Sequence, residues 1–269
     1  DKLILPVGIS IAAFTSVGYL IDLYHGECDP IDDPIRYGVF CSFFGKLYIG
    51  PIVSAQQFVP QLDDPQMTAE GITRGMVQHL RGLAKIVILA GSLQELITQW
   101  ETLLSLEVTI LGTWLHVLCY IFYIYFTLSG YSDMAIGLGK IFGFTFAENF
   151  NYPYISRSVT EFWRRWHMSL GSWFRDYVYI PLGGNRVSKA MWLRNILVVW
   201  LLTGLWHGAA WNFVLWGLVL FVFIALEKFC IGGFLERHRF LSRLYFLFLI
   251  PQTWVVFRIS DLGELGDYF

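Results

Sequence analysis

Long apolar runs separated by short polar connections set the pattern of this chain. A helix needs about 20 mostly apolar residues to cross a bilayer, and residues 3–23, 103–128 and 240–257 meet that requirement. Residues 196–226 form the longest run and contain no Asp, Glu, Lys or Arg. The pattern therefore predicts a chain that crosses a membrane several times.

Other apolar stretches are interrupted. Residues 37–59 contain Gly45, Lys46, Gly50 and Pro51, which predicts a re-entrant or kinked segment, because irregular backbone at membrane depth must be buried in protein or line a cavity. Residues 83–97 read as a short segment that is amphipathic at its end. Residues 129–146 carry four glycines, and we expect these small residues to permit close helix packing: Gly130, Gly137, Gly139 and Gly143.

The composition leaves little of the chain able to face water. Of the 269 residues, 55% are hydrophobic and only 15% are charged, whereas a soluble domain carries about 25% charged residues. We therefore interpret the chain as an integral membrane protein. The net charge of −2 and the lack of a long basic run argue against nucleic acid as a partner. The four scattered cysteines predict neither a disulfide nor a metal framework.

Positive charge is concentrated in one connection. Seven of the 19 Lys and Arg residues lie between Arg157 and Arg194. Cytoplasmic loops of membrane proteins carry an excess of these residues, so we expect this connection to face the cytoplasm.

His207 is the only ionisable side chain in the apolar run of residues 196–226. An ionisable group at membrane depth is costly, so such a residue is a functional-site candidate. Histidine also changes its charge near physiological pH, which suits a general base. The alternative is a core histidine that is hydrogen-bonded to a backbone carbonyl or to Asn212.

Residues 161–177, EFWRRWHMSLGSWFRDY, carry a helical pattern with an aromatic face and a basic face. The basic face repeats at steps of three, four and four residues: Arg164, His167, Gly171 and Arg175. Two guanidinium groups beside a glycine could bind a phosphate or a carboxylate. An interfacial helix that meets anionic lipid headgroups has the same pattern, so both interpretations stay open.

Asp133 is an acid surrounded by apolar residues, which could orient a histidine or pair with a buried arginine. His116 lies within a predicted span and could bond across helices. The other histidines, His25, His79 and His238, lie in polar segments and read as surface residues. The chain has no HExxH motif, no histidine pair at helical spacing and no GxSxG motif. We therefore predict neither a metal site nor a serine hydrolase.

Two long motifs closely resemble the membrane-bound O-acyltransferase family: SGYSDMAIGLGKIFGFTFAENFNYPYISRSVTEFWRRWHMSLGSWFRDYVYIPLGGNR and LLTGLWHGAAWNFVLWG. The match is to the bacterial branch typified by the alginate O-acetylation membrane protein, to which peptidoglycan O-acetyltransferases and the teichoic acid D-alanylation membrane protein are related. GPIVSAQQFVPQL and ILPVGISIAAFTSVGYLIDLYHG resemble further stretches of these proteins. The resemblance thus runs from about Leu3 to the C-terminal end.

The resemblance implies an all-α fold, a polytopic transmembrane helix bundle with amphipathic and re-entrant segments around a central channel. It implies a multi-pass protein of the bacterial plasma (inner) membrane that needs no bound cofactor. Acetyl-CoA on the cytoplasmic side would donate the acetyl group. The implied acceptor is an exported polysaccharide, alginate-like or peptidoglycan, reached through a periplasmic or extracellular partner of the serine esterase-like SGNH kind.

The resemblance also assigns residues. The histidine of the GLWHG motif, His207, is implied to be catalytic, and the histidine of the FWRRWH motif, His167, is the second important one. Relatives usually have further spans on both sides, so we expect residues 1–269 to form a single membrane domain without its N- and C-terminal spans. Lys46 departs from the pattern, because relatives tend to be uncharged at that position.

The chemistry of acyl transfer leads to two hypotheses. A base must take the acceptor hydroxyl proton, and we assign that role to His207, oriented by Asn212 or Asp133. Arg164, His167 and Arg175 would hold the phosphates of coenzyme A. D-alanyl transfer to teichoic acid is an alternative within the same family. A transporter or channel that uses His207 and Asp133 as a proton relay, or a scaffold that only anchors a partner, are alternatives from other classes.

Overall fold

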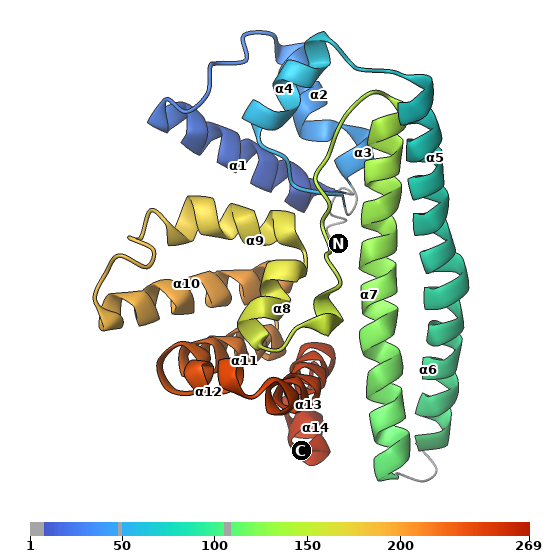
Figure 1. Cartoon of the computed structure of the whole chain (residues 1–269), viewed down its shortest axis with the longest axis vertical. Coiled ribbons are helices and arrows are strands. Elements are labelled where there is room, and N and C mark those ends of the chain that lie inside the picture. Colours follow the sequence, from blue (N-terminus) through green and yellow to red (C-terminus); the bar gives the residue numbers. More distant parts are fainter. Residues whose placement is uncertain (1–7, 48–49, 105–108) are drawn as a thin grey trace, which may run out of the picture. The chain divides into compact units, whose positions relative to one another are not determined.

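A computed structural model of the chain describes residues 8–47, 50–104 and 109–269 (Figure 1). These ranges are mostly helical and contain no strand, which confirms the predicted all-α membrane fold. The chain divides into two compact units, and neither is continuous in sequence. The first unit comprises Asp1–Thr102, Phe122–Phe150 and His167–Trp173. The second comprises Leu103–Ile121, Asn151–Trp166 and Phe174–Phe269.

The first unit is built from the N-terminal helices, the C-terminal half of α7 and most of the short helix α9. Its elements are α1 (Ile9–His25), α2 (Pro34–Ser42), α3 (Phe44–Leu47), α4 (Ala55–Asp63), α5 (Ala69–Ala84), the π-helical η1 (Lys85–Ala90), α6 (Gly91–Leu104), α7 (Ile110–Ile141) and α9 (Met168–Phe174).

The second unit begins with the first turns of α7 and contains the remaining helices. They are η2 (Pro153–Ile155), α8 (Val159–Arg165), the π-helical η3 (Arg175–Tyr179), α10 (Lys189–His207), α11 (Trp211–Leu226), the π-helical η4 (Glu227–Ile231), α12 (Gly232–Arg237), α13 (Arg239–Arg258) and α14 (Leu262–Tyr268).

Three helical runs of the described residues are long and apolar enough to cross a membrane: α7, the continuous run Trp211–Arg237, and α13. The span predicted over residues 240–257 is thereby confirmed. The span predicted over residues 103–128 is confirmed from Ile110 onwards, where α7 begins, and α7 continues to Ile141. Residues 105–108 lie outside the described residues. For the span predicted over residues 3–23, α1 supplies 17 helical residues, and residues 3–7 lie outside the described residues.

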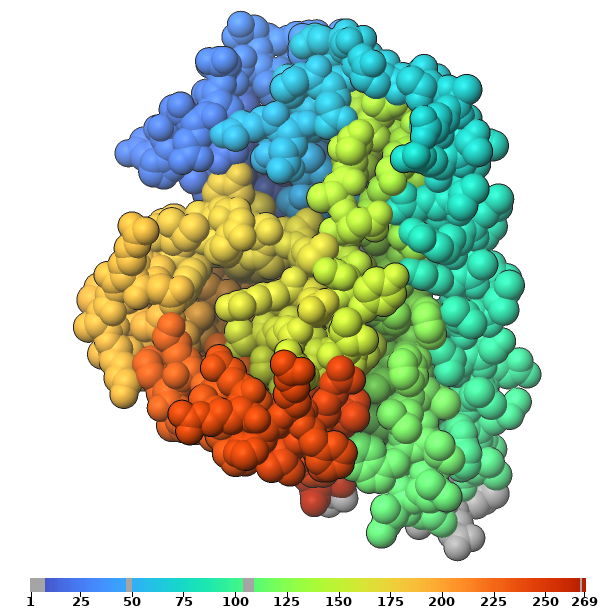
Figure 2. All heavy atoms as spheres, viewed as in Figure 1, coloured from blue at the N-terminus to red at the C-terminus, as the bar shows by residue number. Residues whose placement is uncertain are grey.

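Helices α5 and α7 pack side by side in the first unit, as their touching atoms in Figure 2 show. A Cβ atom added at Gly137 would lie 2.5 Å from the backbone nitrogen of His79, so only glycine permits this approach. The predicted role of the glycines in residues 129–146 is confirmed at this position. The prediction of a short segment over residues 83–97 is wrong, because the helix runs without a break from Ala69 to Leu104.

The predicted interruption of residues 37–59 is confirmed, because α2, α3 and α4 replace a single long helix. These short helices enclose the apolar core of the first unit. The core consists of Tyr19, Phe40, Phe43, Val53, Ala55, Phe58, Ile136, Phe144 and Phe146.

Candidate functional site

The apolar run of residues 196–226 forms two helices, and His207 is the last residue of the first. Helix α11 returns from Trp211 and packs closely on α10. Two glycines allow this contact. A Cβ atom at Gly204 would lie 2.4 Å from the carbonyl oxygen of Phe213, and one at Gly208 would lie 2.6 Å from its ring. The glycines of the GLWHG motif therefore place an aromatic residue of α11 beside His207.

Four aromatic rings surround the imidazole of His207, and we call them the aromatic cage: Trp206, Phe213, Trp216 and Phe257. Their ring centroids lie 4.6, 6.0, 5.3 and 4.9 Å from that of His207. Trp216 is fully buried, whereas His207 is half-buried. No sequence motif predicts the cage, and its local signal is the density of aromatic residues around the GLWHG motif.

Asn212, the predicted orienting residue, bonds to Phe257, a residue of the aromatic cage. Its side-chain Nδ2 donates a hydrogen bond of 2.8 Å to the carbonyl oxygen of Phe257. This bond joins the start of α11 to the end of α13, where Phe257 faces His207. Asn212 is therefore linked to His207 through Phe257, whose ring centroid lies 4.9 Å from that of the imidazole.

Asp133 lies in the first unit and is engaged by cations. Its carboxylate is buried and lies 2.7 Å from the Nζ of Lys85 and 3.4 Å from Nη2 of Arg81. Gln78 also donates to it at 3.4 Å. Of the two roles left open for Asp133, the structure favours pairing with a cation, and the closer partner is a lysine.

The prediction of one helix over residues 161–177 is wrong, because the chain breaks at Trp166 and His167. Asn149 is the cause on the side of α9. Its backbone carbonyl accepts from Met168 N at 2.9 Å and its Oδ1 accepts from Ser169 N at 3.0 Å. A continuous helix would direct these N–H groups to preceding carbonyls. Arg164, His167 and Arg175 therefore do not share a helix face.

His167 itself has a left-handed backbone, with φ of 45°. Such a conformation is uncommon for a residue other than glycine and costs free energy, so it is often found at functional sites. Burial lowers the pKa of His167 to about 4. The imidazole is therefore neutral at physiological pH.

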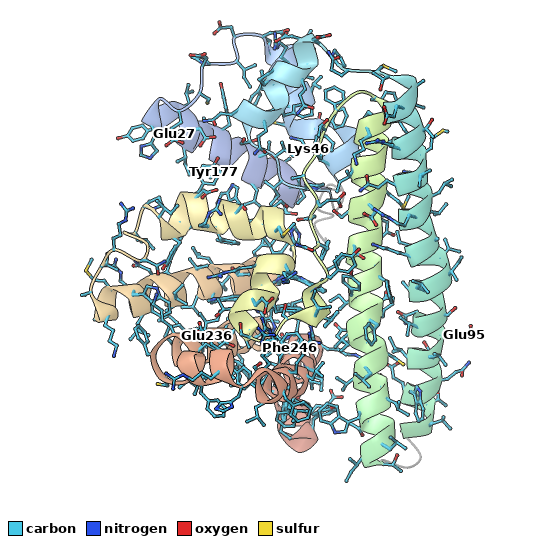
Figure 3. The ribbon with its side chains drawn as sticks, in the orientation of Figure 1. Glu27, Lys46, Glu95, Tyr177, Glu236 and Phe246 are labelled. Atoms are coloured by element: carbon cyan, nitrogen blue, oxygen red, sulfur yellow. The ribbon has the colours of Figure 1, made fainter. Side chains whose placement is uncertain are left out.

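Arg164 and Arg175 are nevertheless brought together, because both line one cavity of the second unit, with a volume of about 740 Å³. Three further cations line it, namely Arg157, Lys228 and Arg239, and so do the carboxylates of Glu161, Glu227 and Glu236. Figure 3 labels Glu236 on α12. Arg175 is paired with its neighbour Asp176 at 2.7 Å, whereas Arg164 is exposed.

Glu227, for which the sequence predicts no role, lines this cavity and bonds to the helix beside it. Its buried carboxylate accepts hydrogen bonds from the backbone nitrogens of Val159 and Thr160, at 2.6 and 2.9 Å. Tyr245 also donates to it, at 3.2 Å. A carboxylate at a helix N-terminus satisfies N–H groups that have no partner within the helix. Glu227 thus fixes the start of α8, the helix that carries Arg164.

Lys46, the departure from the family pattern, lies in α3 and is completely buried (Figure 3). Its Nζ lies 4.4 Å from the ring centroid of Phe40 and 4.8 Å from that of Phe58. Among the described residues the amine has no hydrogen-bond partner. Burial lowers the pKa of Lys46 to about 7.

His116 bonds across helices, as its position suggested. Nη1 of Arg258 lies 2.8 Å from Nε2 of His116, which links α7 to the end of α13. Among the residues that the structure describes, no group of three or more His, Cys, Asp and Glu side chains is placed to hold a metal ion.

Comparison with known proteins agrees with the motifs. The sequence model of the membrane-bound O-acyltransferase family matches residues 33–254. The probable alginate O-acetylase AlgI of Azotobacter vinelandii is 40% identical over 97% of the chain and 52% of that protein. The peptidoglycan O-acetyltransferase of Helicobacter pylori is 33% identical over 97% of the chain and 55% of that protein. The chain spans about half the length of these relatives.

A third relative transfers a different group, according to its name. The teichoic acid D-alanyltransferase of Bacillus subtilis is 31% identical over 85% of the chain and 60% of that protein.

Proposed function

Because the chain belongs to the membrane-bound O-acyltransferase family, we propose that the complete protein transfers an acetyl group from acetyl-CoA towards an exported cell-surface polysaccharide. The observation that carries this proposal is the position of His207. It ends α10 within the aromatic cage, and its side chain is still half-exposed. A base that is enclosed by apolar rings but accessible to a reactant fits acyl transfer.

His207 acts as the general base on the acceptor. Its imidazole takes the hydroxyl proton as the acceptor oxygen attacks the thioester carbon, so an O–H bond breaks while N–H and C–O bonds form. The C–S bond of the thioester then breaks, and the imidazolium returns its proton to the thiolate of coenzyme A. Atoms and charges balance without a cofactor.

Arg164 and Arg175 bind the phosphates of the donor in the cavity of the second unit. Five cations and three carboxylates line this cavity, so its balance favours an anionic ligand. Guanidinium groups bind phosphate oxygens through paired hydrogen bonds. The cavity lies in the connection with concentrated positive charge, and we place it at the cytoplasmic side, where acetyl-CoA is available.

The acceptor side carries the rest of the proposal. The names of the relatives support alginate or peptidoglycan as the modified polymer, and we propose a multi-pass protein of the bacterial inner membrane with an SGNH-type partner outside the membrane. We also propose that His167, the second histidine marked by the family resemblance, is important for the transfer. Its imidazole is neutral and lies at the helix break. One ring nitrogen can therefore donate a hydrogen bond, and the other can accept one.

D-alanyl transfer is the second candidate, and the Bacillus subtilis relative favours it. It would use the same base on a different acyl donor. Within the described residues, no observation favours the transporter or scaffold alternatives. The engagement of Asp133 by Lys85 and Arg81 instead indicates a structural role for that carboxylate.

The test uses the complete gene, expressed in membranes together with its SGNH-type partner. Radiolabelled acetyl-CoA is supplied without an ion gradient, and label is followed into protein and polysaccharide for wild type, His207→Ala and His167→Ala at matched expression. We expect transfer by wild type and loss of transfer in His207→Ala. A folded His207→Ala protein with full activity would disprove the role of His207. No transfer by wild type from acetyl-CoA, but transfer from a D-alanyl donor, would select the second candidate.

A further inference from the structure

Two rings of the aromatic cage stand perpendicular to the imidazole of His207. Trp216 lies at 5.3 Å between ring centroids with an interplanar angle of 89°, and Phe257 lies at 4.9 Å with an angle of 88°. Aromatic rings carry negative charge density on their faces. A cation that lies over a ring face within about 6 Å of the ring centroid is attracted to it. Both distances fall within that limit, and a perpendicular pair allows the edge of the imidazole to point at the ring face.

The two rings are held rigidly. Asn212 fixes the backbone of Phe257 through its 2.8 Å hydrogen bond. Trp216 is fully buried and packs edge-to-face on Trp163 at 5.4 Å and on Trp200 at 5.8 Å. The Phe257 ring packs on Phe213 at 5.0 Å and on Trp254 at 5.4 Å. These contacts hold both rings beside His207. Their electrostatic effect is therefore present before the reaction begins and needs no reorganisation.

The proposed reaction creates a cation at this place. When His207 accepts the hydroxyl proton, its imidazole becomes an imidazolium among apolar side chains, and such surroundings disfavour the charged form. A compensating attraction must come from groups that are already fixed nearby. Ring faces meet this need without the desolvation cost that a second buried charge would carry.

We propose that Trp216 and Phe257 present their ring faces to the imidazole of His207, stabilise its imidazolium form by cation–π attraction and so act as positioning residues of the acyl transfer. The inference rests on the proposed function, because it concerns the charged state of the same base. It differs from a packing role in one respect. Packing depends on the shape of the rings, whereas cation–π attraction depends on the electron density of their faces.

Stepwise fluorination separates these two roles, because fluorine withdraws density from the ring face and changes its shape little. Phenylalanine with one, two or three ring fluorines is incorporated at position 257 in the complete protein, and fluorinated tryptophans at position 216. We expect kcat to fall in even logarithmic steps to about one tenth at the end of each series. The KM for acetyl-CoA should not change.

Phe246 supplies the matched control. It lies on the same helix α13 (Figure 3). It is fully buried, and its ring contacts that of Phe162. The same fluorinated residues at position 246 should leave kcat within about twofold of wild type. Equal losses at positions 246 and 257, or a flat kcat in both cage series, would overturn the proposal.

A second readout needs no turnover. Histidine labelled with ¹⁵N reports the fraction of His207 that is imidazolium at a fixed acidic pH, and the signal is identified by its loss in His207→Gln. This fraction should fall as ring fluorination increases at position 257 and stay constant in the Phe246 series. If wild type transfers no acyl group, the proposed function fails, while this series still decides whether the cage stabilises the cation. A fraction that ignores fluorination would overturn the inference.

Discussion

Two bases of this protein are enclosed by aromatic rings, Lys46 in the first unit and His207 in the second. The surroundings differ in one respect that matters. Lys46 is completely buried, and its amine lies close to two aromatic rings and has no hydrogen-bond partner within the described part of the chain. His207 is half-exposed at the end of a helix.

The comparison teaches that enclosure and function are separate properties. Burial makes the charged form of Lys46 more costly, so the pKa of its amine falls to about 7 and the amine is partly neutral. No reactant can reach it in this structure. His207 keeps part of its side-chain surface exposed. An enclosed base becomes a candidate for chemistry only where a reactant can reach it.

The largest expected effect comes from removing each base and comparing activities. His207→Phe should lower acyl transfer about 10²- to 10⁴-fold, because a general base contributes that much, while the aromatic replacement preserves the packing of the cage. Lys46→Met should keep activity within about twofold. Initial rates of label transfer at matched expression measure both. A large loss in Lys46→Met would place the two bases in one functional class.

The next effect concerns stability. Burial lowers the pKa of Lys46 from 10.5 to about 7 in the folded state, so between these values the unfolded chain binds more protons. The free energy of unfolding of wild type therefore rises with pH across this window and is lowest below its lower limit. Lys46→Met should remove this dependence and raise the free energy of unfolding near neutral pH by roughly 4 kcal/mol.

Unfolding in detergent at about pH 6 and about pH 9 measures this difference. Lys189→Met is the matched control, because Lys189 is exposed at the start of α10. Its pH dependence should equal that of wild type. If Lys46→Met kept the same slope, the amine of Lys46 would be charged and solvated in the folded protein.

The smallest expected effect comes from Arg164 and Arg175, which are exposed, whereas Lys46 and His207 are enclosed. Arg164→Glu and Arg175→Glu reverse the charge of guanidiniums that line the cavity, so each should raise the KM for acetyl-CoA about tenfold with little change in kcat. Arg237→Glu is the control, because Arg237 is exposed on α12 and does not line the cavity. An unchanged donor KM combined with an altered dependence on the acceptor would refute the phosphate assignment.

Apolar patterning predicted those helices whose length is set by their own residues. The spans over residues 103–128 and 240–257 follow from continuous apolar runs, and so does the interruption around Lys46, where glycine and proline break the helix. The segment over residues 83–97 was misjudged, because its support comes from outside it. The glycine contacts between α5 and α7 stabilise a helix whose length its own composition does not predict.

The candidate site shows the same division. His207 stands out within its own run, but the cage includes Phe257 from α13, far along the chain, and no local pattern joins the two. The stripe of Arg164, His167 and Arg175 failed for a similar reason. Asn149 accepts hydrogen bonds from backbone N–H groups that would bond within the helix if it were continuous. The position of Asn149 cannot be predicted from residues 161–177 alone. Sequence periodicity indicates where a helix can form, but it does not show which distant residues compete for the hydrogen bonds of its backbone.

The discontinuous make-up of the two units has a consequence for biosynthesis. The ribosome produces the first piece of the second unit, Leu103–Ile121, before the last piece of the first unit, His167–Trp173. A chain emerging from the translocon therefore cannot finish one unit and then begin the other, as consecutive domains do. Both must wait, partly assembled in the bilayer, until the helix break at His167 has been made. Misfolding of this protein should then be decided late in synthesis, and premature termination anywhere before that break should leave neither unit complete.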